Sequence, residues 1–348
     1  MIQSDSEEIA VSVICLAYNH EKYIRQTLEG FVNQITSFKY EVIIHEDAST
    51  DGTRRIIEEY VEKYPDLFVP IFQEENQYAK GSAYRCKIIY GRARGRYIAN
   101  CEGDDYWCDS NKLQAQYDIM EKYPECSICV HRVNCINEDG SDNIRTFPEN
   151  KYGLTEGVIE KDKFWKIGSY PFHTSSYFVR KEIQDERREL YGKNEWVNYV
   201  NGDVAVLRIS LYKGELYYID KAMSKRRLTV PGSYNDTLKK LSDEEKYNIW
   251  KNSIKSLYMY DEYSHNMFHD HIQQKLVNSI IGRMLIDLDN SEDILKECKI
   301  SCREIFKFAK MNNKIIFVIT YCFPASVWGI RALRRKWKTL KSCFTEKR

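Results

Sequence analysis

The chain has 348 residues, of which 43% are apolar and 30% are charged, and its formal net charge is +1. These values are typical of a soluble globular protein with one large core and a smaller second unit. The eleven cysteines are odd in number and irregularly spaced, and the acidic N-terminus lacks a basic n-region. We therefore expect reduced thiols and a cytosolic protein without a signal peptide or zinc ribbon.

Residues 11 to 130 alternate between short apolar runs and segments with helical spacing. The pattern predicts strands at 11–16, 42–44, 68–72, 97–101 and 127–130, and helices at 24–32, 56–61, 79–94 and 112–123. This β-α repetition predicts a doubly wound, mainly parallel sheet, which binds its ligand beyond the carboxyl ends of the strands. Tyr18, Asp47 and the pair Asp104-Asp105 follow three of the predicted strands. We therefore expect them to converge in one nucleotide site.

The most informative motif is Glu102-Gly103-Asp104-Asp105-Tyr106-Trp107, directly after the strand predicted at 97–101. Two adjacent carboxylates repel each other unless a positive group lies between them. Mg²⁺ or Mn²⁺ suits this position, because such ions bind one or two carboxylates together with phosphate oxygens and water. A solvated Gly-Asp-Asp turn is the simpler interpretation when the motif is taken alone.

Two common nucleotide motifs are absent from the sequence. No G-x-G-x-x-G follows the first strand, which disfavours nicotinamide and flavin cofactors, and no G-x-x-x-x-G-K-[ST] indicates a P-loop. A diphosphate then needs another partner, and a carboxylate-held metal ion fits the aspartate pair.

Three segments resemble family 2 glycosyltransferases of the GT-A fold: residues 11–24, 41–53 and 93–107. The resemblance extends over residues 9 to 235. It implies that Asp105 coordinates the metal ion that carries the donor diphosphate, and that Asp104 lies near the donor ribose or sugar. Arg85 aligns with a base-contacting arginine only within a residue or so. The remaining donor-binding residues that it implies are Ala17, Tyr18, Asn19, Glu46 and Asp47.

The second half of the chain is expected to supply the acceptor side. Gly202-Asp203 precedes an apolar helical pattern, so Asp203 is expected at a helix start, where an aspartate is also a common stabilising cap. The resemblance implies that Asp203 is the catalytic base of an inverting enzyme. It also implies that Arg227 reaches the diphosphate from a flexible loop, although Thr229 replaces the usual histidine. Trp107, His173 and Gly202 are the expected acceptor-side residues.

The C-terminal region combines an uncharged run with a basic strip. Residues 315–330 carry no charge, and residues 331–348 contain eight Lys or Arg against Glu346. The run is shorter than the roughly 20 residues of a spanning helix and contains Pro324. Attachment to an anionic membrane surface is favoured, with a packed core helix as the alternative. Nucleic acid is not expected as a partner, because base-stacking platforms and a recognised fold are missing.

The sequence thus predicts a metal-dependent inverting glycosyltransferase. It would move a sugar from a nucleotide-diphosphate donor, a UDP-sugar in our interpretation, to a carbohydrate or lipid-linked acceptor in surface polysaccharide synthesis, at the inner face of the cell membrane. The alternatives are an inactive sugar-nucleotide or carbohydrate-binding module of the same fold, or a nucleotidyltransferase. The expected organisation is a GT-A domain at 1–235 (donor half 9–130, acceptor half 131–235), a helical extension at 236–312 and the tail at 313–348.

Overall fold

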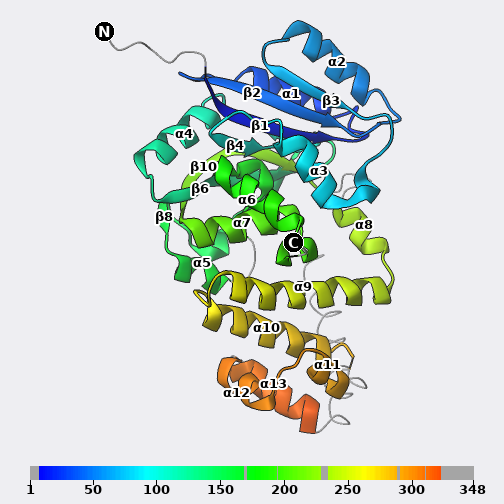
Figure 1. Cartoon of the computed structure of the whole chain (residues 1–348), viewed down its shortest axis with the longest axis vertical. Coiled ribbons are helices and arrows are strands. Elements are labelled where there is room, and N and C mark those ends of the chain that lie inside the picture. The colour runs from blue at the N-terminus through cyan, green and yellow to red at the C-terminus, as the bar shows by residue number, and fades with distance from the viewer. Residues whose placement is uncertain are drawn as a thin grey trace. The chain divides into compact units, whose positions relative to one another are not determined.

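The computed structural model describes residues 8–167, 171–193, 195–228, 234–287, 291–309 and 311–322. The chain divides into two compact units, residues 1–252 and 253–348. The first unit contains the sheet and the site, and the second is helical in its described part (Figure 1). Each unit is considered by itself.

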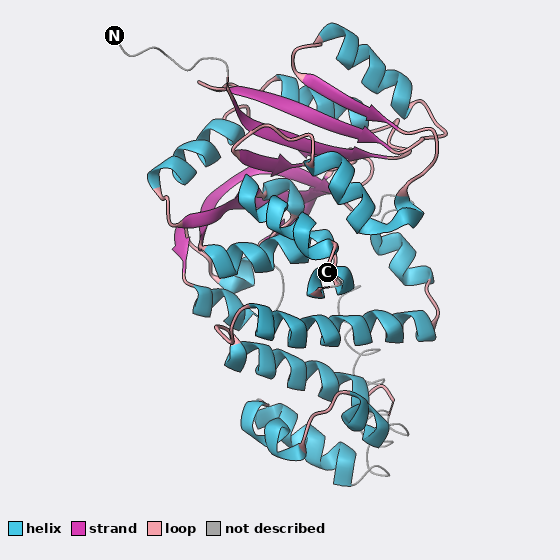
Figure 2. Cartoon of the chain, in the orientation of Figure 1, coloured by secondary structure: helices cyan, strands magenta, loops and turns pink. Residues whose placement is uncertain are grey.

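The described strands all belong to one sheet of the first unit (Figure 2). They are β1 (Ile9–Ala17), β2 (Lys39–Glu46), β3 (Phe68–Phe72), β4 (Tyr97–Asn100), β5 (Tyr106–Trp107), β6 (Cys126–Ile136), β7 (Asp142–Phe147), β8 (Gly157–Ile159), β9 (Phe178–Arg180) and β10 (Glu215–Arg227). Their order is β3-β2-β1-β4-β9-β6-β10-β5, with β7 on β6 and β8 on β10.

The long strands share one direction. β1 is parallel to β2 and β4, β2 is parallel to β3, and β6 is parallel to β10. β9 lies antiparallel between β4 and β6, so both parallel groups point the same way. The mainly parallel sheet expected from the sequence is therefore confirmed, with short antiparallel strands added to it.

The helices of the first unit lie on both faces of the sheet (Figure 1). They are α1 (Ile24–Val32), α2 (Thr53–Lys63), α3 (Gly81–Tyr90), α4 (Lys112–Lys122), α5 (Lys161–Ile167), α6 (Lys181–Tyr191), α7 (Gly202–Lys213) and α8 (Tyr234–Lys240). Short 3₁₀ segments lie at Tyr78–Lys80, Asn150–Tyr152, Thr174–Ser176 and Trp196–Tyr199.

The core of this unit follows from the strand period of two and the helix period of 3.6. Val11, Val13 and Cys15 of β1 lie in one apolar cluster, together with buried residues of α1, α2 and α4. Leu28 and Phe31 of α1 are fully buried in it. Ile14, on the other face of β1, is also buried. Burial on both faces explains the continuous apolar run of this strand.

The acceptor half differs from the sequence expectation in one respect. The resemblance implied that Arg227 lies on a flexible loop. The strand β10 instead continues to Arg227 and pairs with β6 over its length. Pairing with the long β6 provides backbone partners that no local pattern reveals, so the two arginines at 226 and 227 lie on a strand.

The second unit is helical where it is described. Its helices are α9 (Asp243–Tyr263, which begins before residue 252), α10 (His269–Met284), α11 (Ser291–Glu297), α12 (Cys302–Phe308) and α13 (Met311–Cys322). Phe317 of α13 is 2% exposed and packs edge-on against Phe306, with ring centroids 5.9 Å apart. The first part of the uncharged run thus packs within its own unit. The rest of the run and the basic strip lie outside the described residues.

No described helix of this chain is both long enough and apolar enough to cross a membrane.

Candidate active site

The acidic motif at residues 102–105 forms the turn between β4 and β5, beside the carboxyl end of β1. The backbone N–H of Gly103 donates to the Leu16 carbonyl oxygen at 2.8 Å, and the Thr27 hydroxyl donates to the Gly103 carbonyl oxygen at 3.0 Å. A Cβ on Gly103 would lie 2.7 Å from Nδ1 of His20, so this close approach requires glycine. The turn is therefore held against β1 and α1, with its carboxylates at the strand ends.

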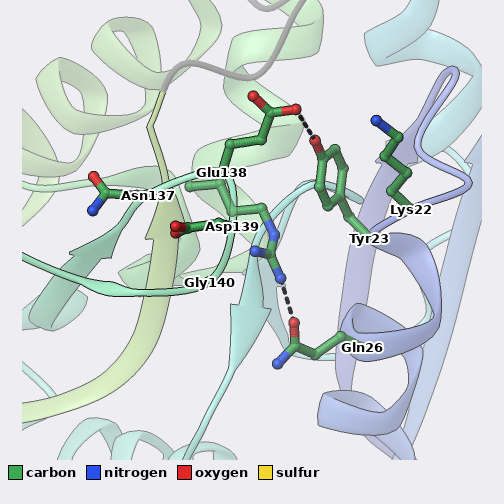
Figure 3. A pocket seen from close by; sticks show the side chains of 8 residues that line it. Lys22, Tyr23, Gln26, Asn137, Glu138, Asp139 and Gly140 are labelled. Carbon is green, nitrogen blue, oxygen red and sulfur yellow. Dashed lines mark hydrogen bonds between the residues drawn. The ribbon is translucent and has the colours of Figure 1, made fainter.

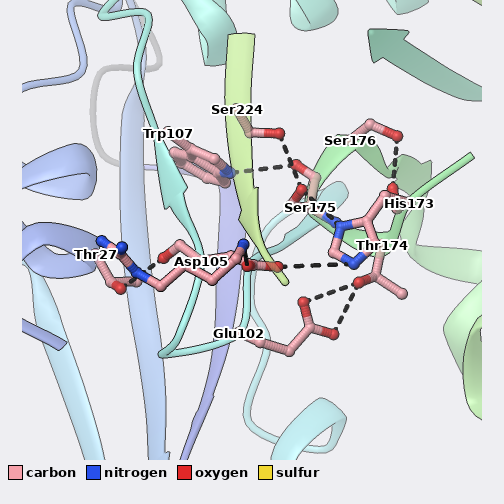
Figure 4. A network of polar contacts seen from close by, with 10 residues as sticks. Thr27, Glu102, Asp105, Trp107, His173, Thr174, Ser175, Ser176 and Ser224 are labelled. Atoms are coloured by element: carbon pink, nitrogen blue, oxygen red, sulfur yellow. Dashed lines mark hydrogen bonds and ion pairs between the residues drawn. The ribbon is translucent and has the colours of Figure 1, made fainter. Parts of the chain in front are cut away.

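Asp105 is the most buried carboxylate of the motif, at 4% exposure. Its Oδ1 accepts the backbone N–H of Arg227 at 2.8 Å, and its Oδ2 lies 3.7 Å from Nε2 of His173 (Figure 4). Burial, with the charges of Asp104 and Glu102, raises the pKa of Asp105 well above its ordinary value. Asp105 therefore joins the motif to the end of β10, at an electrostatic cost.

His173 lies in a buried polar network beside Asp105 (Figure 4). Its Nδ1 is hydrogen-bonded with the Ser175 hydroxyl at 2.9 Å, and that hydroxyl is 2.9 Å from the Ser224 hydroxyl. Burial and the charge of Arg226 lower the pKa of His173 well below its ordinary value, so its ring is neutral at pH 7. A neutral ring at 3.7 Å makes no ion pair with Asp105. The network instead joins the acceptor half to the donor half.

Trp107 also belongs to this network. Its indole N–H donates to the Ser175 carbonyl oxygen at 3.2 Å, and its side chain is 3% exposed. Nζ of Lys112 lies 4.0 Å from the indole centroid, and Phe31 packs edge-on against the ring at 4.9 Å. The contacts of Trp107 and His173 are with other side chains and backbone groups of the protein. Their expected roles on the acceptor side stay predictions.

Glu102 and Asp203 bring the two halves of the site together electrostatically. The Thr174 hydroxyl lies 2.8 Å from each carboxylate oxygen of Glu102. Burial and the charge of Asp104 raise the pKa of Glu102 to about 7, and the charge of Asp203 contributes to this increase. Asp203 lies in the first turn of α7, where its Oδ1 accepts the N–H of Val204 at 2.8 Å. Asp104 of the donor half and Asp203 of the acceptor half thus both raise the pKa of Glu102.

The expected position of Asp203 is confirmed, with one refinement. Gly202 begins α7 and Asn201 is its N-cap, so Asp203 is the second helical residue. Burial raises the pKa of Asp203, whereas the charges of Arg187 and Arg226 lower it. Its carboxylate is half-buried, which suits a group that must be reached by a substrate.

Arg226 and Arg227 point in different directions, as successive strand residues do. The charge of Arg226 acts on Asp105 and Asp203. The Arg227 guanidinium lies 4.9 Å from the ring centroid of Tyr23 and is hydrogen-bonded to Gln26. Sequence reasoning chose Arg227 for the site and overlooked the charge of Arg226 on the carboxyl groups.

A pocket of about 750 Å³ lies beside Arg227 (Figure 3). The Tyr23 hydroxyl in it donates to the Glu138 carboxylate at 3.2 Å. Its walls come from the start of α1, the β6–β7 turn and the end of β10, and its lining residues are Lys22, Tyr23, Gln26, Asn137, Glu138, Asp139, Gly140 and Arg227.

Most of the residues expected to bind the donor cluster at the ends of β1 and β2. The Asp47 N–H donates to the Ala17 carbonyl oxygen at 3.0 Å, and Asp47 Oδ1 accepts the N–H of Gln77 at 2.7 Å. Glu46 Oε1 accepts the N–H of Ser49 at 2.6 Å. Asp47 and Glu46 are thus held by backbone groups and are ordered before any ligand binds.

Two further residues of this cluster have distinct environments. Asn19 has a φ of 55°, and its Oδ1 accepts the N–H of Thr50 at 2.8 Å, which joins the loops after β1 and β2. Tyr18, which precedes it, is 43% exposed and available for stacking.

Arg85 lies on α3, close to the same cluster. Its guanidinium lies 4.8 Å from the ring centroid of Tyr78, and its Nη1 donates to the Tyr78 carbonyl oxygen at 2.9 Å. Its charge also contributes to the lowered pKa of the buried His45 on β2. Arg85 is therefore positioned near the end of β2, and its contact with the donor base stays a prediction.

The donor set fits a divalent cation that takes few protein ligands. Within the described residues, no group of three or more His, Cys, Asp or Glu side chains forms a ready metal site. Burial raises the pKa of Asp105, and the charges of Asp104 and Glu102 raise it further; an added cation would neutralise that local negative charge. Mg²⁺ commonly binds through one or two carboxylates and completes its shell with phosphate and water. The site fits that kind of ion.

The strand order and the acidic turn after β4 define a GT-A type of α/β fold. The structure described as S. aureus TarS 1–349 in complex with UDP-GlcNAc has a TM-score of 0.58 and 18% identity, covering 90% of this chain and 81% of that chain. Similarity at this identity shows the fold alone. Residues 12–184 also match the sequence profile of Glycosyl transferase family 2. Residues 12–184 form a domain of the family 2 glycosyltransferases.

Relatives match a part of the chain. An uncharacterized protein of Mycobacterium tuberculosis is 47% identical over 131 residues, which is 38% of this chain and 37% of the relative. TuaG of Bacillus subtilis, named for teichuronic acid biosynthesis, is 34% identical over 131 residues, which is 38% of this chain and 49% of TuaG. The matches thus span less than half of either relative. Asp203 lies beyond the residues that the family profile matches.

Sequence reasoning did not identify Thr174 or Arg187 as parts of the site. Arg187 stands in the charged run Asp185-Glu186-Arg187-Arg188, which suggests an exposed helix face. Its spacing from Ile183 and Leu190, both buried, places it on the core face of α6. That helical spacing was the signal that could have revealed it.

Proposed function

We propose that the protein is a metal-dependent, inverting glycosyltransferase that uses a nucleotide-diphosphate sugar, in our assignment a UDP-sugar. The acceptor is a carbohydrate or a lipid-linked glycan of surface polysaccharide synthesis. The observation that carries the proposal is the contact between the acidic turn and the acceptor half: Asp105 Oδ1 accepts the Arg227 N–H at 2.8 Å, and the Thr174 hydroxyl lies 2.8 Å from the Glu102 carboxylate oxygens. Asp104 and Asp105 follow a strand of the donor half, and Asp203, whose charge acts on Glu102, lies in the first turn of a helix of the acceptor half.

In this proposal the donor half holds the nucleotide. Gln77 occupies Oδ1 of Asp47, and we assign Oδ2 to accept an N–H of the pyrimidine base. Tyr18 and Arg85 are assigned to the walls of the nucleoside pocket. Ala17, Asn19 and Glu46 shape the loops around it. The TarS structure described with UDP-GlcNAc supports a UDP-sugar as the donor class, at the level of a shared fold.

Asp104 and Asp105 are assigned to hold Mg²⁺ or Mn²⁺ together with the donor diphosphate. The ion would neutralise charge on the leaving diphosphate. Asp104 is the more open of the pair, since Asp105 already accepts the Arg227 N–H. Arg226 and Arg227, at the end of β10, are assigned to interact with the negative charge of the same diphosphate. Gly202, which precedes the base, is assigned to the acceptor side.

Asp203 is assigned as the general base. A sugar hydroxyl is a poor nucleophile until a carboxylate accepts its proton, which contributes roughly 10²- to 10⁴-fold to the rate. The pKa of Asp203 is raised by burial, which brings it closer to neutral pH and increases its basicity as an ion. Attack from the Asp203 side, opposite the leaving diphosphate, inverts the anomeric centre.

The setting that we propose is the inner face of a bacterial cell membrane. TuaG supports a role in polysaccharide synthesis through its name. The basic strip at residues 331–348, with its eight Lys or Arg, supports contact with anionic lipid. Peripheral attachment is thus part of the proposal, together with a cytoplasmic catalytic domain.

The test is a panel of UDP-, GDP-, dTDP- and ADP-sugars with Mn²⁺ or Mg²⁺, measured by nucleotide release with and without candidate glycan acceptors. We expect release from one nucleotide class, its loss in excess chelator, and its loss in Asp47→Ala. Lys122→Ala, at the exposed end of α4, is the control and should behave as wild type. Donor binding without turnover would instead indicate an inactive binding module. Release of pyrophosphate from a nucleoside triphosphate would indicate a nucleotidyltransferase.

A further inference from the structure

A buried guanidinium lies behind the helix that carries Asp203. Arg187 of α6 is 6% exposed, and its Cζ lies 4.6 Å from the ring centroid of Tyr90 and 5.9 Å from that of Tyr191. Its Nη2 donates to Sγ of Cys86 at 3.2 Å. Burial of a charged group is costly without compensation, and aromatic faces compensate only in part.

The guanidinium is also bonded to the start of α7. Nη1 of Arg187 donates to the carbonyl oxygen of Gly202 at 3.2 Å, directly before Asp203. A Cβ on Gly202 would lie 3.3 Å from the same Nη1, so glycine allows this close approach. Because Gly202 is the first residue of α7, the bond holds the backbone turn from which the Asp203 carboxylate projects.

Arg187 reaches the donor half as well. The Asn100 side-chain N–H₂ donates to the Tyr90 hydroxyl at 3.2 Å, and Asn100 is the last residue of β4. The Tyr90 ring in turn packs on Arg187. A continuous series of contacts therefore joins the strand before the acidic motif to the turn that carries Asp203.

The charge of Arg187 acts on the Asp203 carboxylate and lowers its pKa. The guanidinium donates to a thiol and to a carbonyl oxygen, and no carboxylate among the described residues forms an ion pair with it. The charged groups that act on Asp203 are Glu102 from the acidic turn, Arg226 from β10 and Arg187 from α6. The charge of Arg187 thus opposes the increase in the Asp203 pKa that burial causes.

We propose that Arg187 is a positioning residue for Asp203, which holds the first turn of α7 through the Gly202 carbonyl and sets a buried positive charge behind the catalytic carboxylate. The inference rests on the proposed function, since it concerns the base of that reaction. It adds a residue on a different helix, with no contact of its own to the substrate.

The test compares Arg187→Met, Arg187→Lys and the control Arg188→Met across pH, with kcat, donor KM and thermal stability measured for each. Arg188 is the next residue, its side chain is 34% exposed, and it pairs with Asp185. We expect Arg187→Met to lower kcat at least about tenfold, as loss of positioning does, with donor KM within about twofold. The acid limb of its kcat profile should move up by about one pH unit, because an opposite charge is lost.

Arg187→Lys separates the two parts of the role. It retains the charge, so its acid limb should stay at the wild-type pH, while kcat falls because one ammonium cannot replace the guanidinium fork. It also covers the case in which Arg187→Met does not fold. An unmoved acid limb in Arg187→Met, or wild-type kcat in Arg187→Lys, would overturn the inference while the proposed function stands. A wild-type protein without any transfer activity would instead remove the function and, with it, the inference.

Discussion

Asp203→Asn is the most direct perturbation of the proposed mechanism. The substitution keeps the side-chain volume and an oxygen that can accept the Val204 N–H, which Asp203 accepts at 2.8 Å. It removes the proton acceptor. We therefore expect kcat to fall by at least about a hundredfold, the lower end of a general base contribution. Donor affinity should change little, because the nucleotide site is assigned to the first half of the chain.

The structure also sets the expected effect on stability. A carboxylate in the first turn of a helix contributes about 0.3 to 1 kcal/mol through the helix dipole, and this is lost. Against this, the folded-state pKa of Asp203 is raised, so its ionised form costs stability as pH rises above the unfolded pKa. Asparagine removes that cost. The two effects oppose each other, and the free energy of unfolding at pH 7 should change by less than about 1 kcal/mol.

Sugar transfer is measured through the nucleotide that it releases. Isothermal titration calorimetry gives the donor affinity, and chemical denaturation gives the stability. Wild-type kcat should fall as the pH drops through the raised pKa of Asp203, whereas the residual activity of Asp203→Asn should lack that limb. Asp118→Asn, on the exposed face of α4, is the matched control. A mutant that keeps more than about a tenth of wild-type kcat, or one that loses stability and not turnover, would refute the assignment.

Three other predictions follow from the structure. Asp105→Ala should abolish the dependence of donor binding on Mn²⁺ or Mg²⁺ in titration calorimetry while the protein stays folded; unchanged metal-dependent binding would contradict it. Glu41→Gln should lower the free energy of unfolding by about 1.5 to 3 kcal/mol, because fully buried Glu41 accepts from the Arg94 side chain at 2.7 Å and from Ser12 at the same distance. A loss below about 0.5 kcal/mol in chemical denaturation would show that the pair contributes little. Removal of residues 323–348, which retains α13, should release the protein from anionic vesicles, and wild-type binding should weaken as salt screens the basic strip. Vesicle binding that ignores salt and lipid charge would exclude the polybasic contribution.

Several helices and strands could be predicted from the sequence because the residue patterns that determine them are local. The apolar run of β1 indicates burial on both faces, and the spacing of Ile24, Leu28 and Phe31 indicates α1. The motif at residues 102–105 was recognisable because a glycine and two aspartates after an apolar strand restrict both the backbone and the charge. The parallel arrangement followed from the β-α repetition.

The acceptor half depended on contacts between distant residues. The length of β10 follows from pairing with β6, some ninety residues earlier, as in the pair Glu215 and Cys126. The burial of Trp107 follows from Phe31, Lys112 and Ser175, which no local pattern connects to it. Such pairings are decided by packing and by satisfaction of backbone groups over long loops.

The sequence by itself determined which carboxylates follow strands, and therefore the residues that we propose for the donor diphosphate. Only the tertiary structure decided their charge environment. Glu102 has its pKa raised to about 7 because folding buries it and brings Asp104 and Asp203 near it. Arg187 supports Asp203 because α6 packs on α7, although its sequence neighbours suggest an exposed helix face. Burial and charge proximity are properties of the packed chain, so a pattern of residue types cannot specify them.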